Sequence, residues 1–174
     1  MYKIDIIMGD CMKFDKKKQI FRVITTILTL LIIAFIFYNS LMPAGESSQS
    51  SGRVLRFLNG ICEFLGLGSL FTHSLVRTLA HFSEFAVLGA SSLLMYLSYL
   101  GFKVRDLILA LATVLSVAIT DECIQLFSAG RTFQFEDIFV DFSGGTLGAS
   151  FLFLIIFVVN IIKRRRYKNG KSNQ

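Results

Sequence analysis

The residues that could carry chemistry are concentrated in one stretch, Asp121–Gly148 (DECIQLFSAGRTFQFEDIFVDFSGGTLG). This stretch lies between two long apolar runs and partly inside both of them. Charged side chains in an apolar span cost about 2.5–3.5 kcal/mol each on insertion scales, so they usually face the interior of a helix bundle and mark a functional site. We therefore predict that the site lies here. Its polar residues are Asp121, Glu122, Gln125, Arg131, Glu136, Asp137 and Asp141.

A second group of polar residues precedes this stretch on another apolar segment. Arg77, His81 and Glu84 follow one another at steps of four and three residues, which places them on one helical face. If the fold brings the segments together, three helices deliver polar groups to a single layer. In the later segments, the polar residues one turn apart are Asp121 with Gln125 and Asp137 with Asp141.

These residue types fit several kinds of chemistry. The guanidinium groups of Arg77 and Arg131 suit a phosphate. His81 could act as a general base that a carboxylate orients. A metal-dependent variant would combine His81 with a choice of carboxylates. The carboxylates in question are Asp121, Glu122 and Asp141.

Two further interpretations stay open at this stage. The acidic layer could form a pathway for protons or cations. Alternatively, the polar groups could only hold a small bundle together, through interhelical hydrogen bonds of about 0.6–2 kcal/mol each. Asp137 could simply cap a helix, and we expect Glu136 to face solvent. The sequence shows no serine or cysteine nucleophile motif, no glycine-rich phosphate loop and no metal-ligand signature, so we assign no metal and no cofactor.

The chain that must position these residues is too apolar for an ordinary soluble domain. It has 174 residues, of which 53% are hydrophobic, and its mean hydropathy is +0.62. The apolar runs lack the alternation of barrel strands and approach the roughly 20 residues that a helix needs to cross a bilayer. We therefore predict an all-α integral membrane protein with four transmembrane helices. The four segments are Arg22–Leu41, Leu79–Tyr99, Leu107–Phe127 and Ile138–Ile162.

The basic residues predict the orientation of these helices. Lysines and arginines gather before the first span, in the second connection at Lys103 and Arg105, and after the last span. By the positive-inside rule, both termini and the second connection are cytoplasmic. This distribution is typical of membrane-surface anchors and argues against nucleic-acid binding despite the net charge of +6. We expect three parts: a basic segment (1–21), a membrane domain (22–162) and a basic tail (163–174).

The polar connections carry three further predictions. We assign no structure to residues 1–21, and the sequence does not decide whether Met1 or Met12 starts the chain. The serine-rich Asn39–Gly52 is expected to be a turn region. Arg53–Leu67 has helical periodicity and is too short to span, so we expect an amphipathic helix in the outer membrane interface or on the rim of the bundle. Ser74 is the expected N-cap of the second span.

The fourth span combines its acidic face with small residues. Asp137 and Asp141 are followed on the same face by Gly144 and Gly148, a G-x-x-x-G pattern. Small residues at this spacing allow a neighbouring helix to approach closely. We therefore expect Gly144, Gly145 and Gly148 to pack against another helix and the acidic face to point inward.

Together these motifs resemble the VanZ-like family of bacterial membrane proteins, over roughly residues 20–162. The first motif reads Arg77, His81-Phe82, Glu84-Phe85 and Leu88-Gly89. The second reads Asp121-Glu122, Gln125, Gly130-Arg131, Asp137, Asp141, Gly144/Gly145 and Gly148. Ser40, Pro43 and Ser47-Ser48 are similar to the family's serine-rich loop. The chain departs from the family pattern at Thr78 (often lysine), Phe85 (tyrosine), Ile124 (often histidine) and Ala129 (proline).

The resemblance implies a multi-pass protein of the bacterial cell membrane. The namesake of the family is associated with low-level resistance to teicoplanin-type glycopeptides. We therefore expect a protein that binds or modifies a lipid-linked envelope component, such as a cell-wall precursor, at the outer membrane face. The alternatives are an intramembrane hydrolase or transferase and a purely structural polar layer, so catalysis stays open, as does the oligomeric state. The catalytic candidates are His81, Glu84, Asp121 and Glu122, and the ligand-binding candidates are Arg77, Gln125, Arg131, Asp137 and Asp141.

Overall fold

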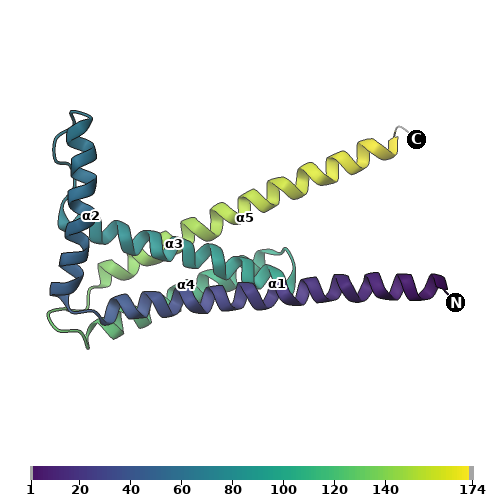
Figure 1. The fold of residues 1–174 in the computed structure, drawn as a ribbon, viewed down its shortest axis with the longest axis horizontal. Helices are drawn as coiled ribbons and strands as arrows, with labels where there is room; N and C mark the ends of the chain where they lie inside the picture. Colours follow the sequence, from purple (N-terminus) through teal and green to yellow (C-terminus); the bar gives the residue numbers. More distant parts are fainter. Residues whose placement is uncertain (1, 173–174) are drawn as a thin grey trace.

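A computed structural model describes residues 2–172 of the chain, which form five α-helices (Figure 1). Side chains are described for residues 16–163, apart from 46–48 and 50, and for Arg165. The side chains of residues 1–15, and most of those in the basic tail, therefore lie outside the described residues. The helices are α1 (Tyr2–Leu41), α2 (Ala44–Phe64), α3 (His73–Leu100), α4 (Val104–Gln125) and α5 (Phe135–Ser172).

Four of these helices are long and apolar enough to cross a membrane, which confirms the predicted all-α fold class. α1 and α5 continue beyond the apolar segments, so the prediction of no structure for residues 1–21 is wrong. A helix that has nucleated in an apolar span adds one hydrogen bond for each further residue, and lysine is a good helix former. The candidate spans are Lys16–Leu41, His73–Leu100, Val104–Gln125 and Phe135–Lys163.

The expected turn region at Asn39–Gly52 is mostly helical, which corrects the prediction. α1 ends at Leu41, and α2 begins at Ala44 directly after Pro43. Proline has no backbone N–H and a fixed φ, so it ends one helix and suits the start of the next. The expected amphipathic helix is therefore longer than predicted and starts earlier. Its placement in the membrane interface stays a prediction.

The start of α3 also differs from the prediction. Thr72, not Ser74, is the N-cap, and its Oγ1 accepts a hydrogen bond from the backbone N–H of Leu75 at 3.2 Å. An N-cap residue needs an extended backbone, which Thr72 has, whereas Ser74 already lies inside the first turn. Asn59 of α2 fixes the preceding connection by binding both the N–H (2.9 Å) and the carbonyl (3.1 Å) of Phe71.

α3 and α5 pack with their backbones close together. A Cβ atom added to Gly148 would overlap the backbone carbonyl of Ala86, and one added to Gly144 would overlap that of Phe82. On the facing helix, a Cβ on Gly89 would overlap the carbonyl of Gly145. Glycine is therefore required on both sides of this contact. Two apolar clusters complete the core: Ile36, Phe85, Leu88, Val114, Val117 and Ala118, and Leu93, Ala110 and Ala149.

The topology collects the ends of three spans at one end of the bundle. Both termini extend from the side on which α3 connects to α4, while α2 stands across the opposite end (Figure 1). The α4–α5 connection lies at that opposite end too (Figure 1). The start of α3, the end of α4 and the start of α5 therefore meet beside α2.

Candidate functional site

The polar residues that the spacing singled out come together at this end of the bundle. We call them the polar layer: Arg77, His81, Glu84, Asp121, Glu122, Gln125, Arg131, Asp137 and Asp141. The side chains of Asp121, Glu122, Gln125 and Asp141 are fully buried. Glu136 is exposed and stays outside the layer.

Gln125 is the centre of the hydrogen-bond network on α4. Its Nε2 donates to Asp121 Oδ2 at 3.0 Å and to Glu122 Oε1 at 2.9 Å. Its Oε1 accepts from Arg77 Nη2 at 3.3 Å, which links α4 to α3. One amide thus connects two buried carboxylates with a guanidinium, because it has both donor and acceptor atoms.

The second oxygens of these two carboxylates also have donors. Ser40 Oγ of α1 donates to Asp121 Oδ1, and the backbone N–H of Gln134 donates to Glu122 Oε2 at 2.9 Å. Ser128 Oγ in turn donates to the carbonyl of Ser40 at 2.7 Å. Asp121 and Glu122 are therefore held rigidly by their surroundings.

α1 is a fourth contributor, which the spacing argument missed. Asn39 Nδ2 donates to Glu84 Oε1 at 3.1 Å, and the Asn39 carbonyl accepts from Arg131 Nη2 at 3.4 Å. The available signal was the pair Asn39-Ser40 at the end of an otherwise apolar run, directly before the polar turn. Side chains of that kind at a buried helix end need partners, and here the partners belong to the polar layer.

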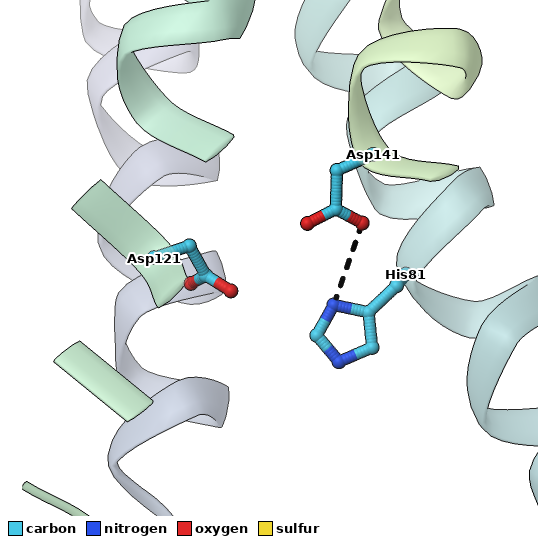
Figure 2. Close-up of side chains that lie close together, drawn as sticks. All are labelled: His81, Asp121 and Asp141. Atoms are coloured by element: carbon cyan, nitrogen blue, oxygen red, sulfur yellow. Dashed lines mark ion pairs between the residues drawn. The ribbon is translucent and has the colours of Figure 1, made fainter. Parts of the chain in front are cut away.

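His81, Asp121 and Asp141 face one another across the interior, from α3, α4 and α5 respectively (Figure 2). His81 Nδ1 lies 3.7 Å from Asp141 Oδ1, which is too long for a hydrogen bond. One possible ligand atom from each of the three residues lies within 4.8 Å of the others. Among the described residues, neither Asp141 oxygen nor His81 Nδ1 has a hydrogen-bond partner.

The two arginines of the layer are held differently. Arg77 is about one-third exposed and lies 3.7 Å from Asp137, measured between Nη2 and Oδ2. Arg131 is more enclosed, and its Nε and Nη1 are buried without a hydrogen-bond partner among the described residues. Burial lowers the pKa of the Arg131 guanidinium from its ordinary value, and the positive charge of Arg77 lowers it further, against the effect of nearby carboxylates.

A cavity of about 500 Å³ opens beside the layer, between α2 and α3. This volume is in the range of small-molecule and cofactor sites. The polar part of its wall consists of Asn39, Arg77, His81, Glu84 and Arg131, together with Ser51 and Ser83. The apolar part consists of Met42, Val54, Leu58, Val76, Leu79 and Ala80.

Comparison with known proteins gives one assignment. No curated protein and no solved structure matches the chain. The family described as VanZ/LLP1 matches residues 25–159, which is more than half of the chain and includes the whole polar layer. This match confirms the family to which the motifs pointed: the chain belongs to the VanZ/LLP1 family.

Proposed function

We propose that this multi-pass protein binds the phosphate-bearing headgroup of a lipid-linked envelope component at the outer face of the bacterial cell membrane. The observation that carries this function is the composition of the cavity wall. Two guanidinium groups line one part of the cavity, and apolar side chains of α2 and α3 line another. A molecule that fits both needs an anionic group joined to a hydrocarbon chain.

The arginines favour a phosphate over other headgroups. Arg77 and Arg131 border the same cavity, and their like charges oppose each other. An anion between them relieves this repulsion, and a guanidinium can donate two parallel hydrogen bonds to phosphate oxygens. Arg131 has donors to spare, because its Nε and Nη1 bond no described residue.

The apolar wall is suited to the chain of a lipid. Val54 and Leu58 of α2 face the cavity together with Val76 and Leu79 of α3. Burial of apolar surface contributes about 25 cal/mol per Å². These side chains therefore stabilise a bound hydrocarbon chain, in addition to the stabilisation of the headgroup by the arginine charges. α2 thus completes the site rather than merely connecting two spans.

The basic residues support this orientation. Lys103 and Arg105 lie at the connection from α3 to α4, and Arg22 bonds Ser98 near the end of α3. Both termini extend from that same side (Figure 1), so the positive-inside rule favours an outer position for the polar layer. A reporter fused to the C-terminus should therefore read cytoplasmic, and one inserted at Gln49 should read external. An external C-terminus would place the cavity on the cytoplasmic side and remove the envelope lipid as its ligand.

The binding experiment uses the full chain in detergent, with a polyprenyl phosphate and the matching polyprenol as probes. We expect the phosphate to bind and the polyprenol to bind at least tenfold more weakly. Arg131→Ala should lose at least tenfold in affinity for the phosphate, since charge-assisted hydrogen bonds contribute about 1.5–3 kcal/mol.

Arg53→Ala is the matched control, because Arg53 is an exposed arginine of α2 outside the cavity. Equal loss in both variants, or equal binding of phosphate and polyprenol, would contradict headgroup recognition. In a bacterial host, we expect Arg131→Ala to change teicoplanin susceptibility at near-normal membrane abundance. Activity that only follows abundance would instead support a structural role for the polar layer.

The pairing of His81 with Asp141 favours enzymatic modification of the bound lipid as a second candidate function. His81 borders the cavity, and a carboxylate lies beside its ring nitrogen, as a general base requires. Glutamine keeps hydrogen bonding but cannot transfer the proton. An enzyme would therefore lose all function in His81→Gln, whereas a binding protein would keep part of it.

A further inference from the structure

We propose that His81, Asp121 and Asp141 bind one divalent transition-metal cation, such as Zn²⁺ or Mn²⁺, between α3, α4 and α5. The three residues lie 40 and 20 positions apart in the chain, so no short ligand motif announces the site. The fold assembles it. This site adjoins the arginine-lined wall, with which it shares His81, but cation binding does not require the lipid.

The spacing of the three side chains suits a metal ion. Bonds from zinc to histidine nitrogen and carboxylate oxygen measure about 2.0–2.2 Å, which puts neighbouring ligand atoms roughly 3–4 Å apart. His81 Nδ1 and Asp141 Oδ1 are 3.7 Å apart, and the ligand atoms of all three residues lie within 4.8 Å of one another. Because Ser40 and Gln125 hold Asp121 in place, we expect rotations of His81 and Asp141 to bring all three into contact with one ion.

The surroundings of the Asp141 carboxylate indicate that it binds a ligand. Its side chain is fully buried, and neither oxygen has a hydrogen-bond partner among the described residues. It points toward His81 and faces Asp121 across the gap (Figure 2). Buried carboxylates are normally hydrogen-bonded, ion-paired or bound to a metal. In the described part of the chain its ion-pair partner is His81, and the distance of 3.7 Å leaves room for an ion.

Asp121 has the surroundings of an oriented ligand. Ser40 and Gln125 each donate to one of its oxygens, which fixes the direction of the carboxylate and leaves lone pairs free on both. Metal-binding carboxylates are commonly held by such outer hydrogen bonds. Gln125 is in turn held by Arg77, so the support extends across two helices.

A small cavity adjoins the site. Its volume is about 20 Å³, with room for about one water-sized particle, and its wall includes His81, Asp137 and Asp141 but not Asp121. Arg77 also borders this cavity, but Asp137 and Gln125 engage its guanidinium. His81 lines the 500 Å³ cavity as well, so an ion bound here can be reached from the proposed headgroup site.

The donor set selects the class of ion. One imidazole and two carboxylates form a mixed nitrogen and oxygen site, which suits Zn²⁺ or Mn²⁺. Three protein ligands also leave a coordination position open for water or a ligand oxygen, as in catalytic rather than structural zinc sites. The two aspartates balance the charge of the ion inside an apolar span.

The experiment measures metal binding by the purified full-length chain in detergent. The protein is stripped with EDTA, desalted and titrated with Zn²⁺ and with Mn²⁺, and bound metal is counted by mass spectrometry after gel filtration. We expect about one ion per chain. Asp141→Asn and His81→Gln should each lower the affinity at least tenfold, whereas Glu136→Gln, which changes an exposed carboxylate of the same helix, should leave it unchanged.

Electron paramagnetic resonance of the Mn²⁺-loaded wild type gives an answer that no folding defect can mimic. Coupling of the manganese to a histidine nitrogen is expected. A wild-type chain that retains no ion, or variants that melt normally in EDTA and bind metal like the wild type, would overturn the site.

Failure of the metal site and failure of the headgroup site are distinguishable. Polyprenyl phosphate binding measured in EDTA tests the arginine-lined wall without any ion. Phosphate binding without metal binding would overturn the metal site alone, and the converse would overturn headgroup recognition alone.

Discussion

Asp106 and Asp141 are both fully buried, at opposite ends of the bundle, and they differ in what surrounds them. Asp106 lies in the first turn of α4, where its Oδ2 accepts the backbone N–H of Lys103 at 3.0 Å. Its Oδ1 lies 3.7 Å from Arg105 Nε. Asp141 lies beyond the first turn of α5, and neither of its oxygens accepts a hydrogen bond from a described residue.

Burial of a charged side chain does not by itself indicate function. A helix N-terminus offers free N–H groups and a favourable dipole, so a carboxylate there can be held by its own helix. Asp106 Oδ2 is held in this way, although Asp106 Oδ1 has no hydrogen-bond partner among the described residues. Inside a helix, those groups are already used. Asp141 must therefore be satisfied by another helix or by a ligand, and only this second kind of buried carboxylate marks a candidate site.

The remaining polar groups at the two ends follow the same division. At the Asp106 end, Arg22 Nε donates to the carbonyl of Ser98 at 2.9 Å, and its guanidinium lies 5.4 Å from the centre of the Tyr99 ring. Phe102 and Phe153 stack nearby with ring centres 4.6 Å apart. At this end Asp106 Oδ1 is the buried carboxylate oxygen without a hydrogen bond to a described residue, and it has the Arg105 guanidinium beside it. The polar layer instead combines several unpaired donors and acceptors with a cavity.

The largest effect is expected from Gly148→Leu, which attacks the contact that holds the Asp141 end together. The new side chain would overlap the backbone of Ala86, so α3 and α5 must separate and His81 must move away from Asp141. Overpacking against a backbone that cannot yield should destabilise the protein by about 3 kcal/mol. The measurement is the yield and melting temperature in detergent.

Ser150→Leu is the control for this change, because Ser150 is exposed on the same helix. Ala149 does not serve, since it is itself fully buried in the core. Equal stability of Gly148→Leu and Ser150→Leu would show that the glycine contact does not set the distance between the two helices.

Much of the fold could be predicted because a lipid bilayer restricts which secondary structures can span it. Long apolar runs can only be helices, and their number and approximate places follow from hydropathy. The exact ends could not be read from hydropathy, since capping and helix propagation set them. Thr72 rather than Ser74 caps α3, and α2 begins at Ala44 because of Pro43.

The candidate site was predictable only in part. Regular helical spacing was enough to place His81 and Glu84 on one face of α3, because 3.6 residues make a turn. The roles of Asn39 and Ser40 depend on how α1 packs against α3 and α4, which no local pattern encodes. The cavity also depends on the angle of α2, which sequence periodicity does not specify.

The difference between Asp106 and Asp141 can be tested by changing each of them separately to asparagine and measuring the melting temperature of each variant in EDTA. Asp106→Asn should lower stability by about 0.5–2 kcal/mol, because it removes a buried charge that the start of α4 favours. Asp141→Asn should leave stability unchanged or raise it, because without metal its carboxylate has no hydrogen bond to a described residue to lose. The two changes are chemically identical, so only the surroundings can produce opposite results.

Arg105→Ala identifies which partner of Asp106 matters. The Arg105 side chain is 57% exposed, and exposed ion pairs contribute only about 0–1 kcal/mol. We therefore expect a smaller loss of stability than for Asp106→Asn, which would assign the stabilisation to the helix start rather than to the ion pair.

If Asp141→Asn proves more destabilising than Asp106→Asn, Asp141 already has a protein partner. The polar layer would then hold the bundle together, and the distinction between the two ends would be lost.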